Sequence, residues 1–210
     1  MVLKKLVGSA LLLMFAAMSW AAEFVEGTHY ERLPVQVETT EGVVEVVEVF
    51  SYACIHCFNF DPYVESWREK QSDDVAFRRI PAIFSADWEL LALAFYTAET
   101  LGVLDAIHMP MFEGIHTRQQ DLRQVPLLHE LFAEHADVKG EDFDTAYNSF
   151  SVRSRVQQAK AKGRAYRITG VPSLIVAGKY RVDGRLAGSN TGMLEVVDHL
   201  VQLERAAANQ

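Results

Sequence analysis

The chain has 210 residues, a formal net charge of −8 and a hydrophobic fraction of 50%. This fraction is enough for a globular core and excludes an intrinsically disordered chain, while the acidic balance excludes the concentrated basic surface that nucleic-acid binding requires. Two cysteines are too few for a small scaffold held together by disulfides, so their position in the sequence has to explain them.

The N-terminal segment has the pattern of a secretory signal peptide. Two lysines precede an uncharged apolar stretch from Leu6 to Met18, and small residues follow it. That stretch is too short to cross the roughly 30 Å hydrocarbon core of a membrane as a helix, which argues against a retained anchor. We therefore expect residues 1–21 to be cleaved and residues 22–210 to form a single soluble domain, exported to a compartment where disulfides persist.

The first part of the mature chain predicts a strand, a helix and a second strand. Residues 43–50 (VVEVVEVF) are rich in β-branched residues and apolar at both odd and even positions, which is typical of a strand covered on both faces. A helix is expected over residues 58–70, with a kink at Pro62. A second strand is expected over residues 75–83, with Pro81 marking its frayed end.

The middle of the chain changes to apolar residues at helical spacing, which predicts a helical insertion over about residues 87–160. Glycines and prolines divide this insertion into several helices, with breaks expected at Gly102, Pro126 and Gly140 and a break or kink at Pro110.

Strand character returns near the C-terminus. Residues 173–176 (SLIV) and 180–182 flank a tight turn at Gly178-Lys179, which predicts a β-hairpin. A last amphipathic helix is expected over residues 193–205. The whole order of elements predicts an α/β fold, in which helices flank a mixed sheet with a parallel pair and an antiparallel hairpin.

The two cysteines, Cys54 and Cys57, form a Cys-x-x-Cys pair directly after the first predicted strand. A structural disulfide closing so short a loop would stabilise the fold by only about 2 kcal/mol. A metal site would need further cysteine or histidine ligands at suitable spacing, and the chain has no second cysteine pair. The spacing favours a redox centre over both alternatives without excluding either.

The position of the pair gives its two sulfurs different expected roles. A cysteine at the start of a helix faces unpaired backbone N–H groups and the positive end of the helix dipole, which stabilise a thiolate. Cys54 is expected to be exposed and attacked by substrates, whereas Cys57 is expected to be shielded and to act as the resolving thiol. His56 adds a positive or hydrogen-bonding partner. A stabilised thiolate is a good leaving group, so the disulfide would act as an oxidant.

The motif CIHC, the stretch FNFDP after it, the helical block and the segment TGVP before the hairpin resemble the DsbA family of periplasmic thiol:disulfide oxidoreductases. The resemblance covers nearly all of residues 22–210. It implies a thioredoxin-like fold with an inserted all-helical subdomain, and DsbA itself is a standard example of a low-pKa cysteine and a strongly oxidising disulfide.

The resemblance implies that a Cys54–Cys57 disulfide is donated, through a mixed disulfide, to reduced unfolded proteins after export. A membrane quinone-linked reoxidase of the DsbB type would restore the disulfide, and no metal or dissociable cofactor is implied. A monomer is the default expectation. The alternatives are a disulfide isomerase or reductase, although the segment before the first strand leaves no room for the dimerisation module of related isomerases, and a chaperone-like binding module with a vestigial disulfide.

The resemblance also assigns roles to individual residues. Pro172 matches the cis-proline of the family, beside which the backbone of Val171 would pair with an extended substrate segment. The alternative is a trans proline that merely begins a strand. Glu48 matches a buried acid that would relay a proton as Cys57 is released, and the alternative is a solvated glutamate at the strand end.

The dipeptide between the cysteines matches the family in part. His56 corresponds to the histidine of the family's variable dipeptide, whereas Ile55 stands where well-known members carry proline. Isoleucine adds a backbone N–H near the sulfurs and lacks the stiffness of proline, so thiolate stabilisation is expected to differ from that of those members.

Overall fold

The computed structural model describes residues 24–208, and the predicted signal peptide, residues 1–21, lies outside this range. The described chain forms a five-stranded sheet of order β1-β5-β4-β2-β3. Its strands are β1 (Glu31–Arg32), β2 (Val44–Phe50), β3 (Val75–Pro81), β4 (Ser173–Val176) and β5 (Tyr180–Asp183). Because β2 and β3 are parallel and the other neighbouring pairs are antiparallel, the expected mixed sheet is confirmed.

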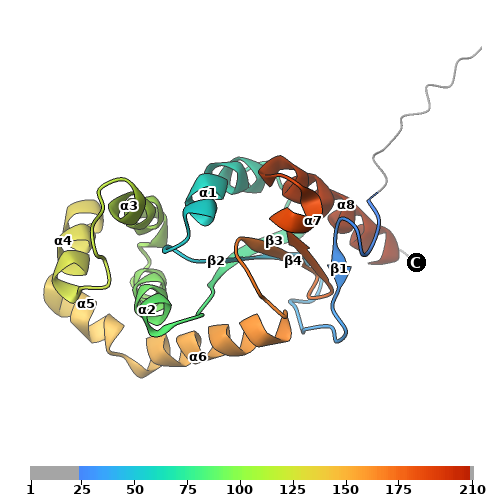
Figure 1. Ribbon diagram of the computed structural model, residues 1–210. Coiled ribbons are helices and arrows are strands. Elements are labelled where there is room, and N and C mark those ends of the chain that lie inside the picture. Colours follow the sequence, from blue (N-terminus) through green and yellow to red (C-terminus); the bar gives the residue numbers. More distant parts are fainter. Residues whose placement is uncertain (1–23, 209–210) are drawn as a thin grey trace, which may run out of the picture.

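Helices cover both faces of this sheet. Figure 1 shows α1 and α8 on one face and α6 on the other, with α2 to α5 gathered beyond one end of the sheet. The helices are α1 (Ile55–Arg68), α2 (Ala86–Thr100), α3 (Leu104–His116), α4 (Val125–Ala136), α5 (Gly140–Tyr147), α6 (Phe150–Ala165), α7 (Gly184–Ala187) and α8 (Asn190–Ala208). The insertion, α2 to α6, thus lies between β3 and β4. Within residues 24–208, no helix is long and apolar enough to span a membrane.

The alternation of side chains along β2 creates two hydrophobic cores. Val46 packs with α1 and α8 on one face, and Val47 and Val49 pack with the helical insertion on the other. β2 is almost fully buried, as expected for a strand covered on both faces. Glu48 has the same parity as Val46 and therefore points under α1, toward the interior.

Several element boundaries differ from the sequence prediction. Helix α1 begins at Ile55, directly after Cys54, and Pro62 lies inside it. Of the break or kink expected at Pro110, the break is wrong, because this proline lies within α3. Ile107 and Met111 are buried on either side of Pro110, so packing holds both turns of α3 in place despite the missing backbone donor.

The other predicted breaks are correct. Gly102 connects α2 to α3 with a φ of +71°, a conformation that glycine adopts without steric cost. Pro126 lies in the first turn of α4, where its missing N–H needs no partner, and Gly140 begins α5. Strand β1 was not predicted, because its two residues are too few for a periodic pattern.

The packing between the insertion and β2 gives a test of the fold. Phe112 is 1% exposed and its ring contacts those of Phe50 and Tyr52, so Phe112→Ala should lower the free energy of unfolding by about 3–5 kcal/mol. Phe150, which is 86% exposed, provides the matched control, and Phe150→Ala should change stability by less than about 0.5 kcal/mol. Urea unfolding at a fixed redox state measures both values, and equal effects would contradict this account of the core.

Candidate active site

The end of β2 delivers the two cysteines to the start of α1. Cys54 is the N-cap residue of α1 and is half-buried, whereas Cys57 lies one turn into the helix and is fully buried. The Cys54 N–H donates to Ser51 O at 3.0 Å, and the Cys57 N–H donates to Cys54 O at 3.0 Å. The structure therefore gives one accessible sulfur and one shielded sulfur in the same turn.

The two thiols have pKa values displaced in opposite directions. The side-chain hydrogen bond from Cys57 is the largest influence on Cys54 and, with the backbone N–H groups and positive charge nearby, lowers its pKa to about 6, although partial burial opposes this. Burial raises the pKa of Cys57, and its interactions with Cys54 and Glu48 raise it further. At neutral pH the reduced site therefore holds a thiolate at Cys54 and a thiol at Cys57.

His56 is exposed on the first turn of α1, between the two cysteines. Its positive charge, when protonated, contributes to the low pKa of Cys54, after the hydrogen-bonding contributions. Ile55, at the first position of the helix, is 45% exposed and adds an apolar surface beside Cys54.

The loop of residues 169–172, here called the cis-proline loop, lies beside the accessible sulfur. The Val171–Pro172 peptide bond is cis, so the alternative of a trans proline is wrong. Val171 O lies 3.5 Å from Cys54 Sγ. Within the described residues the Val171 N–H donates no backbone hydrogen bond, which leaves it available to a chain bound alongside.

Glu48 is 1% exposed, so the alternative of a solvated glutamate is wrong. It pairs in register with Arg79 on β3, and Arg79 Nε donates to Glu48 Oε2 at 2.8 Å. Burial raises the pKa of Glu48 to about 7, despite the opposing charge of Arg79. This carboxyl group therefore exchanges a proton in the neutral range, close enough to Cys57 to influence its pKa.

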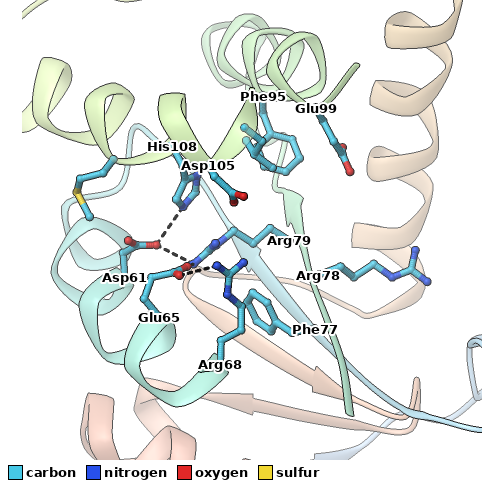
Figure 2. Close-up of a pocket in the computed structure, with 12 residues that line it drawn as sticks. Asp61, Glu65, Arg68, Phe77, Arg78, Arg79, Phe95, Glu99, Asp105 and His108 are labelled. Carbon is cyan, nitrogen blue, oxygen red and sulfur yellow. Dashed lines mark hydrogen bonds and ion pairs between the residues drawn. The ribbon is translucent and has the colours of Figure 1, made fainter. Parts of the chain in front are cut away.

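Arg79 also binds two carboxylates of α1, a cluster that was not predicted from the sequence. Figure 2 shows Asp61, Glu65 and Arg79 converging at the edge of a cavity of about 350 Å³. Arg79 Nη2 lies 2.8 Å from Asp61 Oδ1 and 2.7 Å from Glu65 Oε1. Two features of the sequence could have indicated this cluster. One is the aspartate of FNFDP at a helical position that is buried, and the other is the pair of arginines inside the otherwise apolar strand β3.

His108 of α3 extends this cluster to the segment in front of Cys54. Its Nε2 lies 3.0 Å from Asp61 Oδ1, and its Nδ1 lies 2.9 Å from the Tyr52 hydroxyl. A dashed line marks the His108–Asp61 contact in Figure 2. Burial lowers the pKa of His108, so the ring is neutral at pH 7. The hydrogen-bond partners then fix the tautomer: Nε2–H donates to the Asp61 carboxylate, and the Tyr52 hydroxyl donates to Nδ1.

A second histidine of α3 holds the same tyrosine. His116 Nε2 is hydrogen-bonded to Tyr52 O at 2.8 Å, and its ring stacks on Phe58 with 5.4 Å between ring centroids. Both the hydroxyl and the carbonyl of Tyr52 are therefore bound by the helical insertion, which positions the residues leading into Cys54.

No group of three or more histidine, cysteine or carboxylate side chains within residues 24–208 is arranged to hold a metal ion.

Comparison with known proteins agrees with this geometry. Residues 79–191 match the sequence profile of the DSBA-like thioredoxin domain. The thiol:disulfide interchange protein DsbA of Azotobacter vinelandii is 38% identical over 187 residues, which cover 89% of this chain and 87% of that protein. The chain belongs to the DsbA family. The DsbA protein of Pseudomonas aeruginosa is 36% identical over 212 residues, which cover 99% of this chain and 100% of that protein.

Solved structures of DsbA proteins share the fold. The crystal structure of Pseudomonas aeruginosa DsbA superimposes with a TM-score of 0.85 at 37% identity, covering 89% of this chain and 97% of that one. The DsbA oxidoreductase of Xylella fastidiosa gives a TM-score of 0.81 at 34% identity, covering 87% and 98%. The predicted thioredoxin-like fold with an inserted helical subdomain is therefore confirmed.

The opposed pKa shifts of the two thiols predict the behaviour of a single variant. Cys57→Ala removes the hydrogen-bond donor that contributes most to the low pKa of Cys54, so the midpoint of thiolate absorbance should rise from about 6 toward the ordinary thiol value of about 8.5. In the control variant Cys54→Ala, no thiolate should form near neutral pH, because burial keeps Cys57 protonated. A midpoint that stays at about 6 in Cys57→Ala would contradict this assignment.

The low pKa of Cys54 also predicts that the reduced protein gains stability as the pH rises from about 6 to about 8.5. In this window Cys54 is ionised in the folded chain and protonated in the unfolded chain, so unfolding takes up a proton. The contribution is complete above the unfolded pKa and is lost as the pH falls through the folded pKa.

Urea unfolding of the reduced and oxidised proteins across this window tests that expectation. The oxidised protein lacks both thiols but retains Glu48, so the difference between the two forms reports on the thiols. Below about pH 8 this difference is dominated by Cys54, because Cys57 is then protonated in both the folded and the unfolded chain. A difference that does not change with pH would refute the link between thiolate stabilisation and folding.

Proposed function

We propose that this protein oxidises pairs of thiols in reduced, unfolded proteins by donating a Cys54–Cys57 disulfide to them. As a member of the DsbA family the chain is a thiol:disulfide oxidoreductase. The observation that supports the direction of transfer is the accessible Cys54 at the start of α1, with its pKa lowered to about 6. A stabilised thiolate favours the reduced enzyme, so the disulfide tends to pass to the substrate.

The reaction balances as two thiol–disulfide exchanges. A substrate thiolate attacks Cys54 Sγ, a substrate–Cys54 bond forms, and the Cys54–Cys57 bond breaks with Cys57 leaving as a thiolate. A second substrate thiolate then attacks the substrate sulfur of the mixed disulfide, and Cys54 leaves as a thiolate. Two substrate thiols have been oxidised to a disulfide, and the enzyme disulfide has been reduced by the same two electrons.

Glu48 is the proposed proton donor to the departing Cys57. Its pKa of about 7 lies near the working pH, and the high pKa of Cys57 makes the newly formed thiolate a strong proton acceptor. The proton consumed here is replaced when the substrate thiols ionise. His56 is proposed to stabilise the negative charge that develops on Cys54 in the second exchange.

The cis-proline loop is proposed to orient the substrate. The free N–H of Val171 and its carbonyl oxygen beside Cys54 offer backbone partners to an extended segment, in the manner of strand addition. Pro172 lacks an N–H, and with Val171 it sets the path of the loop past the sulfur.

The cellular setting is likewise part of the proposal. Removal of residues 1–21 would release the protein into the periplasm, where it would act as a monomer on newly exported proteins. A membrane-bound, quinone-linked reoxidase of the DsbB type would return the reduced cysteines to a disulfide. Both points are supported by membership of the DsbA family.

Refolding of a reduced protein that contains several cysteines tests the proposed function. Stoichiometric oxidised enzyme should convert the substrate thiols to disulfides, whereas Cys54→Ser should be inactive because the attacked sulfur is absent. Oxidation by the serine variant at the parent rate would disprove the catalytic role. Faster action on scrambled disulfides than on reduced chains would indicate an isomerase, and suppression of aggregation by both proteins without oxidation would indicate a binding module.

A further inference from the structure

A groove of about 470 Å³ lies between the cis-proline loop, α6 and the connection from β3 to α2. Its lining includes Ile83 and Phe84 from that connection, Arg164 from α6, and Arg167 and Thr169 from the segment after α6. None of these side chains belongs to the sulfur chemistry or to the buried carboxylate cluster. The groove is therefore a separate surface feature next to the redox site.

The floor of the groove is apolar and partly open to solvent. Phe84 is 51% exposed, and its ring lies against that of Trp88 with 5.1 Å between centroids. Ile83 and Ile168 are half-buried beside it. An exposed aromatic side chain supported from behind by a second ring is suited to contact an apolar side chain of a binding partner.

The rim of the groove is basic. Lys160, Arg164 and Arg167 line it, and no carboxylate does. Lys160 is neutralised by Glu89 at 2.8 Å. Within the described residues the guanidinium groups of Arg164 and Arg167 have no ion pair or hydrogen bond, so two uncompensated positive charges stand here in a chain of net charge −8.

Helix stability alone does not account for both cations. Arg164 lies in the last turn of α6, where a positive charge interacts favourably with the helix dipole. Arg167 lies beyond the helix end, in a left-handed conformation with φ of 53°, and its carbonyl oxygen accepts a hydrogen bond from Arg181. That bond fixes the backbone and so helps to hold Arg167 at the groove.

The groove is within reach of a chain joined to Cys54. Thr169 lines the groove, and Val171, two residues later, places its carbonyl oxygen 3.5 Å from Cys54 Sγ. An extended chain advances about 3.3 Å per residue. A substrate segment that runs along the cis-proline loop therefore arrives at the groove about two to four residues from its reacting cysteine.

We propose that this groove is a substrate subsite that selects an acidic side chain, next to an apolar one, about two to four residues from the reacting cysteine. Arg164 and Arg167 bind the carboxylate, because the planar guanidinium group matches its two oxygens, and Phe84 receives the apolar neighbour. This inference rests on the proposed function, since it names the substrates that the same redox site prefers.

The test uses reduced peptides with two cysteines and one variable residue, Asp, Asn or Lys, placed two to four residues before or after the reacting cysteine. The rate constant for oxidation by the intact oxidised protein should be about three- to tenfold higher for Asp than for Lys, on one side of the cysteine only. The ratio of the Asp rate constant to the Lys rate constant should fall toward one at high salt, because screening weakens an exposed ion pair.

Matched variants distinguish the effect of the groove on substrate preference from the effect of the protein's overall charge. The double variant Arg164→Gln/Arg167→Gln should lose the preference for Asp over Lys. The control Arg153→Gln/Arg185→Gln removes the same charge at exposed positions that do not line the groove and should keep the preference. Loss of the preference in both double variants would show that it depends on the net charge of the protein and not on the groove arginines, and would overturn the inference.

The outcomes also separate the inference from the proposed function. If the parent protein oxidises all peptides at the same rate, the subsite is disproved while the oxidase activity stands. If it oxidises none of them, the proposed function itself fails. A preference for phosphoserine peptides without one for Asp would replace the carboxylate by another anion and refute the stated ligand.

Discussion

One guanidinium group, that of Arg79, is shared by three carboxylates beneath the redox site, and much of the surrounding structure depends on this imbalance. Glu48 and Asp61 are buried and would be costly without a cation, and Arg79 ties β2, β3 and α1 together through these two carboxylates and the partly exposed Glu65. Arg68 also pairs with Glu65, at 2.9 Å, so two cations face three carboxylates. Burial, reinforced by the nearby carboxylates of Asp61 and Glu65, raises the pKa of Glu48 to about 7 despite Arg79, and Glu48 in turn raises the pKa of Cys57.

The inserted helices complete the redox site as well as enlarging the fold. Two histidines of α3 bind the hydroxyl and the carbonyl of Tyr52, two residues before Cys54. Through Asp61, one of them, His108, also joins the carboxylate cluster. The turn that presents the accessible sulfur is thus held from the sheet side by backbone hydrogen bonds and from the insertion by side chains.

The sequence was most informative where structure depends on local patterns. Alternating and continuous apolar runs located β2 to within one residue, and the turn at Gly178 located the hairpin. The buried cluster was missed because its bonded partners on different elements lie 14 to 47 residues apart, and periodicity contains no information about which distant charges meet. Pro110 misled for a related reason: tertiary packing on both sides kept its helix continuous. The resemblance to DsbA, in contrast, pointed to Glu48 and Pro172 through motif position alone.

Two separate sets of elements carry the reactivity of the sulfurs and the surface next to them. The groove arginines are supplied by α6 and the segment after it, whereas the groups that shift the cysteine pKa values come from β2, the turn after it and the start of α1. Mutations on α6 can therefore change which polypeptides are engaged without altering the driving force of electron transfer. Related enzymes can therefore evolve different substrate preferences while keeping the same reduction potential, because the two properties are encoded in different segments of the chain.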